Sequence, residues 1–250
     1  NEGEGRFREA AYLAGLADSD WGWSPKLEDF DEDGRIDAFL TNGMTRNLTH
    51  SDHPMDPRDF IGKTEFDHYR HTGFKKDVNL AFRNEGDLRF VKIAKDWGLA
   101  HEGMSFAAAH GDLDRDGDLD LVVANLNEPA HLYRNESHEK NRLLVSLKGP
   151  NALGSKVTVV TAKRRQTKTL RPMTGYMSCD EPVLHFGLGE EDYIGVLEIL
   201  WADGTEQDFG DIHANRFLEI TKTTGETTIP LPVTPPQQLF REVSTPDNLR

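Results

Sequence analysis

Cysteine and long apolar runs are nearly absent from this sequence. Cys179 is the single cysteine among 250 residues, so no disulfide bond can form within the chain. This suits a cytosolic protein, or one outside a bacterial cell that bound ions stabilise in place of disulfides. No apolar run approaches the roughly 18 residues of a membrane-spanning helix, so we expect no transmembrane segment.

The short motifs of several enzyme classes are also missing. The sequence has no G-x-S-x-G nucleophile turn, no H-E-x-x-H zinc motif and no glycine-rich phosphate loop before a helix. Cys179 and His185 are candidates for a nucleophile and its base. A single cysteine in a strand-rich region is, however, more often an inert apolar residue. We therefore favour a protein that is not an enzyme.

Positive charge is scarce too. The chain has 29 lysines and arginines against 43 aspartates and glutamates, which gives a formal net charge of -14. An acidic surface repels phosphate groups, so we expect neither nucleic acid nor an anionic membrane as a partner. Ten of the carboxylates fall in two short segments, where bound cations would offset part of the excess charge.

Those two segments, residues 29–37 and 112–120, share the pattern D-x-D-x-D-G-x-x-D. Glycine at position 6 permits a sharp turn that brings the oxygens of positions 1, 3 and 5 together. Position 7 would add its backbone carbonyl, and position 9 would close the shell. Because these are all hard oxygen ligands, we predict one Ca²⁺ in each loop, rather than zinc or copper. The predicted ligands are Asp29, Asp31, Asp33, Arg35, Asp37, Asp112, Asp114, Asp116, Asp118 and Asp120.

An EF-hand is the obvious alternative for such a loop. It requires a glutamate at position 12 and a helix on each side. Position 12 is Leu40 in the first copy and Val123 in the second, and the flanking residues are typical of buried strands. We therefore place each loop between two strands. A solvated acidic turn that binds nothing is the other alternative, and the second copy at identical spacing disfavours it.

The acidic pattern belongs to a longer internal repeat. Asn1 and Asn42 each have a counterpart 83 residues later, and the second acidic loop starts 83 residues after the first. A third copy begins near Asn135, which is 51 residues after Asn84. About 50 residues is the size of one β-propeller blade. We therefore predict propeller blades over residues 1–138.

A polar insertion at about residues 44–76 enlarges the first of these units. It carries two His-x-x-His pairs, which are candidates for a transition-metal site. The alternative is a polar loop that is merely rich in histidine, and we favour it because no helical spacing is secured. The four histidines are His50, His53, His68 and His71.

From about Asn141 the chain alternates apolar and polar residues in short stretches that are typical of strands. Six such stretches lie within about 80 residues, separated by turn signals. They predict a compact β-sandwich or barrel-like domain over residues 139–228, so the fold class is all-β throughout. Five prolines then predict an extended tail over residues 229–250. The predicted strands cover residues 142–147, 156–161, 165–170, 183–186, 195–201 and 216–220.

These motifs together resemble a known family. The acidic loops, with residues 106–112 leading into the second, are similar to the FG-GAP/VCBS repeats of calcium-binding propellers. Three motifs of the second half are similar to the ASPIC/UnbV domain, namely T-G-Y-M-S at 174–178, H-F-G-L-G at 185–189 and L-W-A-D-G at 200–204. Over roughly residues 1–225, the order of these parts resembles the cartilage acidic protein family. Ala202 and Cys179 depart from the family pattern, and neither is a predicted calcium ligand.

The resemblance implies a secreted, calcium-stabilised propeller followed by a β-rich domain, and it implies no established activity. Because this chain carries only two units, we expect a partial β-propeller here. We predict an extracellular, periplasmic or cell-surface protein that binds or scaffolds other proteins, with structural Ca²⁺. The alternative is an enzyme or accessory factor of secondary metabolism or carbohydrate chemistry. Its site would lie in the propeller channel or in the histidine-rich insertion, and a glycan or small-molecule ligand stays open.

The repeat count also predicts a partner surface. A propeller needs about four to eight blades to close, so two units would leave an edge strand and an apolar face exposed. We expect further blades of a longer precursor, or another protein chain, to cover that face. The second domain and the proline-rich tail are the less favoured cover. The chain begins at Asn1 without a methionine, which we interpret as a matured or trimmed product.

Overall fold

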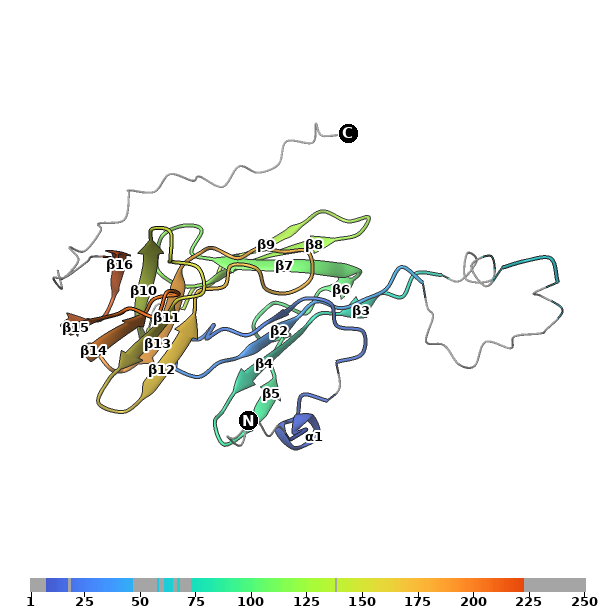
Figure 1. Cartoon of the computed structure of the whole chain (residues 1–250). Coiled ribbons are helices and arrows are strands. Elements are labelled where there is room, and N and C mark those ends of the chain that lie inside the picture. Colours follow the sequence, from blue (N-terminus) through green and yellow to red (C-terminus); the bar gives the residue numbers. More distant parts are fainter. Residues whose placement is uncertain are drawn as a thin grey trace.

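A computed structural model places the chain in two groups of β-sheets (Figure 1). The structure describes residues 8–17, 19–46, 58, 61–64, 67, 73–137 and 139–222. The four histidines of the predicted insertion and the proline-rich tail lie outside these residues. Strands dominate the part that is described, where the helix α1 (Ala11–Ala14) is a single short turn. The all-β prediction is confirmed.

The first half forms three sheets. A four-stranded antiparallel sheet has the order β1-β2-β4-β5, a two-stranded sheet pairs β3 with β6, and a three-stranded antiparallel sheet has the order β7-β8-β9. The bounds are β1 Pro25–Lys26, β2 Ala38–Leu40, β3 Asp77–Val78, β4 Leu80–Asn84, β5 Phe90–Lys92, β6 Glu102–Gly103, β7 Ser105–Gly111, β8 Asp120–Asn125 and β9 His131–Tyr133.

Each acidic loop joins two paired antiparallel strands, as the sequence predicts. The first loop connects β1 to β2, which pair with Pro25 opposite Leu40. The second connects β7 to β8, which pair with Gly111 opposite Asp120. Buried Phe39 and Val123 follow the two loops and belong to one hydrophobic cluster that both sheets share. This strand–loop–strand setting excludes the EF-hand.

The second half packs two sheets around one core. The orders are β13-β10-β16, in which β10 and β16 run parallel, and β12-β11-β14-β15. Trp201 and Phe186 are among its fully buried side chains. The bounds are β10 Asn141–Lys148, β11 Lys156–Val160, β12 Arg165–Thr169, β13 Leu184–Gly189, β14 Tyr193–Leu200, β15 Glu206–His213 and β16 Arg216–Thr221.

The six strands predicted for this half overlap strands of the structure, but the sequence analysis missed β15. Its residues E-Q-D-F-G-D-I-H are mostly polar, and only Phe209 and Ile212 are buried. Their spacing of three breaks the period-two alternation that marks a strand. Pairing with β14 along its length therefore decides its conformation.

The structure supports only part of the predicted propeller and of the predicted sandwich or barrel. Among the described residues, the sheets neither close into a barrel nor form a ring of blades. The second half matches the sandwich alternative, with two sheets on one core. In the first half, the four-stranded and three-stranded sheets lie next to each other, each with an acidic loop at one end.

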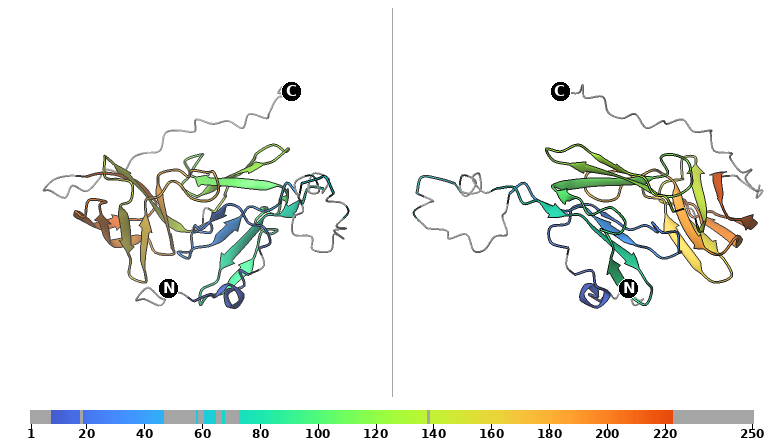
Figure 2. Two further views of the ribbon diagram at one scale, coloured as in Figure 1. Left: turned by 45° about the vertical axis from the view of Figure 1, so that its right-hand side comes forward. Right: turned by 180° about the vertical axis from the view of Figure 1, so that it is seen from behind.

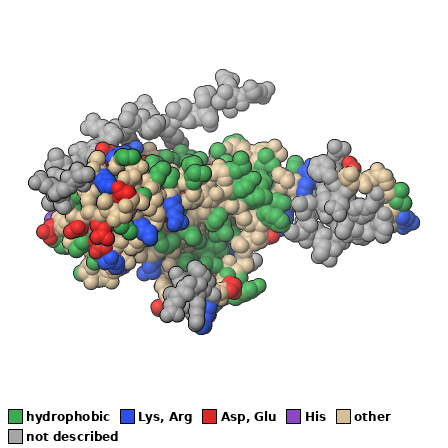
Figure 3. Space-filling model, in the orientation of Figure 1, with side chains coloured by type: hydrophobic (Ala, Val, Ile, Leu, Met, Phe, Trp, Pro, Cys, Tyr) green, Lys and Arg blue, Asp and Glu red, His purple; other side chains and the backbone are tan. Residues whose placement is uncertain are grey.

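The acidic loops lie where the two halves meet. In both views of Figure 2, the second-half sheets lie on the side of the first half where β2 begins and β7 ends. Figure 3 shows hydrophobic side chains spread over the first-half sheets, whereas charged side chains gather over the second half. Each loop thus has one side against the second half, while Arg35, Leu113 and Arg115 within the loops are exposed.

Candidate metal centre

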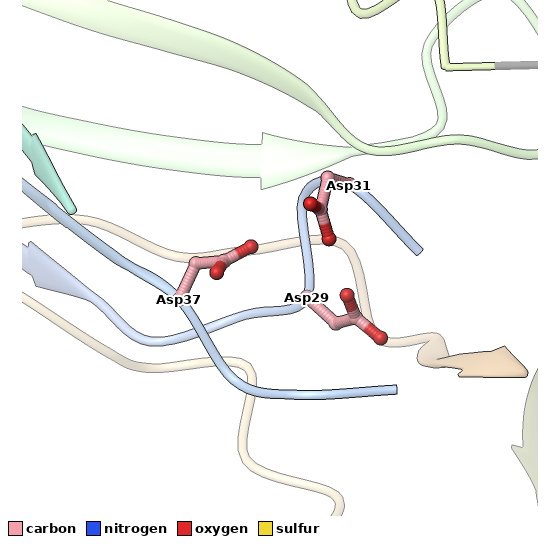
Figure 4. A group of neighbouring side chains, drawn as sticks. All are labelled: Asp29, Asp31 and Asp37. Atoms are coloured by element: carbon pink, nitrogen blue, oxygen red, sulfur yellow. The ribbon is translucent and has the colours of Figure 1, made fainter. Parts of the chain in front are cut away.

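Three carboxylates of the first acidic loop converge. Asp29, Asp31 and Asp37 each offer an oxygen, and the three oxygens lie within 4.8 Å of one another. Figure 4 shows the three carboxyl groups directed into the same space. Asp29 and Asp37 are fully buried, whereas Asp31 is half-buried. The loop therefore brings together three of the five predicted ligands.

The second loop gathers Asp112, Asp114 and Asp116, whose oxygens also lie within 4.8 Å of one another. Asp112 is buried, and its Oδ1 has no hydrogen-bond donor among the described residues. A buried carboxylate oxygen without a donor is unfavourable unless a cation lies beside it. Clustered hard oxygen atoms are the ligands that Ca²⁺ prefers. The residues present therefore fit the predicted ion.

The closing aspartate of each loop makes the same two backbone contacts. Asp37 accepts the N–H groups of Phe30 at 3.0 Å and Asn84 at 2.9 Å. Asp120 accepts an equivalent pair at 3.0 and 2.9 Å, the second from Asn135. Asn84 and Asn135 are the residues at which the next repeats were predicted to begin. Position 9 thus ties each loop to the following repeat.

The structure does not decide whether the Asp33 carboxylate and the position-7 backbone carbonyls are ligands. Asp33 forms an ion pair with the Arg35 guanidinium and accepts the Arg35 backbone N–H at 2.9 Å. Buried Asp118 accepts the Ser137 backbone N–H at 2.9 Å. These contacts shape the loops. That Asp33 joins the ion, and that residues 35 and 118 offer their carbonyls, stays a prediction.

Burial and neighbouring carboxylates disfavour the ionised form of these side chains. Burial, with smaller contributions from neighbouring carboxylates, raises the pKa of Asp29 to about 8 and that of Asp37 to about 7. The same causes raise the pKa of Asp112 to about 6 and that of Asp118 to about 8. A divalent cation would reverse this effect by stabilising the ionised form.

Two arginines of the second half hold the loops at equivalent positions. Arg164 donates to the backbone carbonyl of Asp33 at 2.5 Å, and Arg142 donates to the backbone carbonyl of Asp116. Asp33 and Asp116 both occupy position 5 of the acidic pattern. The sequence analysis missed both arginines, because a contact to a backbone carbonyl leaves no residue pattern to detect.

Comparison with known proteins finds similarity along most of the chain. The family described as ASPIC and UnbV matches residues 146–227. Human cartilage acidic protein 1 is 28% identical over 270 residues, covering 92% of this chain and 40% of the relative. The chain is thus similar to cartilage acidic protein 1 over most of its length. The proteins of the same name from mouse (28%) and Xenopus tropicalis (26%) each match 82% of the chain and 37% of their own length. The chain thus spans about two fifths of the length of these relatives.

The H-F-G-L-G motif that suggested the family lies against both acidic loops. A Cβ on Gly187 would overlap the Asp29 carboxylate, so only glycine allows this close approach. The Gly189 N–H donates to the Glu32 carbonyl of the first loop at 2.9 Å. His185 Nε2 lies 3.1 Å from the Gly117 carbonyl of the second loop. The motif therefore serves the contact between the two halves of the chain.

These contacts give His185 a role different from the catalytic one considered from the sequence. The His185 side chain is almost fully buried against the loops, whereas Cys179 is exposed. The T-G-Y-M-S motif also packs between the halves. Trp23 lies between Tyr176 and Phe106, with ring centroids 5.0 and 4.9 Å away. Trp23 and Phe106 are equivalent repeat positions, so the aromatic side chain at this position serves packing between the two repeats and the second half.

Substitution of the position-6 glycines is expected to weaken calcium binding without removing a ligand. Gly34 has φ +84 and Gly117 has φ +100, and a Cβ on either would overlap an arginine of the second half. The left-handed conformation costs a residue with a Cβ about 1–2 kcal/mol. Titration calorimetry of Gly34→Ala and Gly117→Ala should show affinity reduced by about fivefold or more.

Gly204→Ala is the matched control for this strain. Gly204 has φ +85, but nothing lies within 4 Å of its Cβ position, and it is in a turn of the second half. The control should lose a similar amount of thermal stability and keep its calcium affinity. Unchanged affinity in both loop variants would contradict the proposed loop geometry.

Proposed function

We propose that this chain is a calcium-stabilised extracellular module that binds or scaffolds other proteins. The observation that carries the proposal is the pair of equivalent acidic loops, each with three converging carboxylates. Calcium at such a site lowers the repulsion among carboxylates and thereby stabilises the fold. This is a structural use of the ion, which suits a chain with one cysteine and no internal disulfide.

The extracellular assignment draws on the relatives. They are named cartilage acidic protein 1, which suits a protein outside the cell, where calcium sites of modest affinity are filled. No helix among the described residues is long and apolar enough to cross a membrane. The acidic composition suits calcium-rich surroundings and disfavours nucleic acid.

A protein partner is the ligand that the surface favours. The sheet β7-β8-β9 ends at β9, where no further strand is paired among the described residues. Leu132 on β9 is 65% exposed, so this edge strand presents an apolar side chain as well as unpaired backbone groups. We propose that further FG-GAP/VCBS blades or another protein chain pair with this edge, beside the ASPIC/UnbV domain at residues 139–228.

The enzyme alternative predicts a pocket lined by histidine and carboxylates away from the loops. A cavity of about 200 Å³ at the contact between the halves is lined by Glu28, His110, Lys168 and Asp180, among others. Three of its charged groups are already in ion pairs, Lys168 with Glu28, and Asp180 with the neighbouring Lys26. It is also smaller than the roughly 300–1,000 Å³ of most ligand sites. These features favour a structural polar network and hence the binding function.

Calcium titration of the metal-free chain tests the proposed function. Calorimetry should show two calcium ions per chain, and Asp31→Asn or Asp114→Asn should each remove one, because each removes a charged oxygen from one cluster. Asp208→Asn, at an exposed position on β15, is the control that should keep both sites. Absence of calcium uptake by the unmodified chain would end the proposal.

A further inference from the structure

Glu32 is an acidic residue of the first loop that is not a predicted ligand. It occupies position 4 of the pattern, has φ +58 and is completely buried. A buried carboxylate is costly unless it is paired and hydrogen-bonded. The corresponding residue of the second loop, Arg115, is exposed. The burial of Glu32 therefore belongs to a specific arrangement at this one loop.

The partners of Glu32 come from the second half. Arg142 Nη1 donates to both carboxylate oxygens of Glu32, at 3.1 and 3.0 Å. His185 Nε2 lies 3.5 Å from Glu32 Oε1. Both partners are themselves largely buried, so water screens the contacts weakly. The position of Glu32 fixes the Arg142 guanidinium.

The same two partners also contact the second loop. Arg142 Nη2 donates to the backbone carbonyl of Asp116. His185 Nε2 lies 3.1 Å from the backbone carbonyl of Gly117, which can only accept, so this nitrogen carries the hydrogen. A continuous set of short polar contacts thus runs from Glu32 of one loop to the turn of the other.

One backbone conformation of each loop sets both an inner face, which carries the carboxylates, and an outer face, which contacts the second half. Carboxylate oxygens converge on the inner face, where Asp112 Oδ1 is buried without a donor among the described residues. On the outer face of the second loop, the backbone carbonyls of Asp116 and Gly117 receive Arg142 and His185. An ion that orders the inner face therefore also places the groups of the outer face.

We propose that Glu32, Arg142 and His185 are positioning residues that couple the two calcium sites. Calcium in one loop then favours the conformation of the bridge that the other loop requires. By linkage the effect is reciprocal, and couplings of this kind typically change an affinity by about 5- to 150-fold. This inference rests on the proposed calcium binding and adds that the two sites are not independent.

The test is a thermodynamic cycle on the full chain, with calcium as the probe. Asp114→Asn disables the second loop, and calorimetry then measures the affinity of the first. With Glu32 in place, this variant should bind calcium at the first loop on the order of tenfold more weakly than the unmodified chain does. In the Glu32→Gln background, Asp114→Asn should change the first-loop affinity by less than about twofold.

Glu198→Gln is the matched control for Glu32→Gln. Glu198 forms an exposed ion pair with Arg165 at 2.6 Å on the second half, away from the loops. Glu198→Gln should leave the tenfold effect of Asp114→Asn intact. Loss of the effect in Glu32→Gln alone would then be due to the bridge and not to the general cost of replacing a paired glutamate. If Glu32→Gln fails to fold, Arg142→Lys takes its place in the cycle.

The outcomes separate this inference from the proposed function. Two calcium ions bound with no effect of Asp114→Asn on the first loop would overturn the coupling and leave the proposed function standing. An effect that persists unchanged in Glu32→Gln would overturn the assigned bridge. If the unmodified chain binds no calcium, both the proposed function and the coupling fail.

Discussion

Removal of calcium should lower the melting temperature of this protein by about 10 °C or more. A ligand present at 100 times its dissociation constant stabilises the folded state by about 2.7 kcal/mol per site. Two sites therefore contribute about 5 kcal/mol. In a chain of about 250 residues, 1 kcal/mol shifts the melting temperature by about 2–4 °C. Differential scanning calorimetry of calcium-saturated and metal-free protein measures the difference.

Two controls assign the shift to the loops. A double variant, Asp31→Asn with Asp114→Asn, lacks a charged oxygen in each cluster and should melt at nearly the same temperature with and without calcium. Magnesium at the same concentration should stabilise the protein less, because it requires a tighter octahedral shell. Equal melting temperatures for the metal-free and calcium-saturated protein would refute the structural role of the ion.

The size of the shift should grow from about pH 6 to about pH 8. In the unfolded chain these carboxylates have a pKa near 3.8, whereas burial raises the pKa of Asp29 to about 8 and that of Asp37 to about 7. At pH values between the unfolded and the folded pKa, the metal-free folded state holds more protons than the unfolded state. Its free energy of unfolding therefore falls as pH rises through this range. Calcium replaces the protons, so the bound form escapes this loss.

The acidic loops and their strands follow from the sequence, because they depend on local chemistry. Four aspartates and a glycine at fixed spacing specify a tight turn, and the apolar residues after each loop specify a strand. Asp37 and Asp120 make matching contacts in the structure, so the 83-residue repeat is real in three dimensions. The repeat size alone does not show how the sheets are arranged around one another.

What the sequence analysis missed is the contact between the two halves. Arg142, Arg164 and Glu32 look like ordinary surface charges in the sequence, and Lys26 looks like a strand-end residue. Their roles depend on partners far along the chain, often backbone carbonyls, and such pairs have no characteristic spacing. The H-F-G-L-G motif was detected as a family signature, but its physical purpose, close approach to Asp29, appears only in the structure.

Lys26 provides the second large expected effect. Its side chain is fully buried at the contact between the halves, and its ammonium group donates to Asp180 at 2.7 Å. It also donates to the carbonyl and hydroxyl oxygens of Thr174, each at 2.8 Å. Asp180 in turn accepts the backbone N–H of His110 at 3.1 Å. This pair joins β1 to the T-G-Y-M-S segment.

Lys26→Met should destabilise the protein by about 3–5 kcal/mol, because it leaves the Asp180 carboxylate buried without its cation. Adding Asp180→Asn removes that charge and keeps a carbonyl oxygen for the His110 N–H, so the double variant should regain much of the loss. Arg165→Met, at the exposed pair with Glu198, is the control and should cost less than about 1 kcal/mol. Urea denaturation in excess calcium measures all three. A Lys26→Met variant as stable as the control would show that this buried pair does not hold the two halves together.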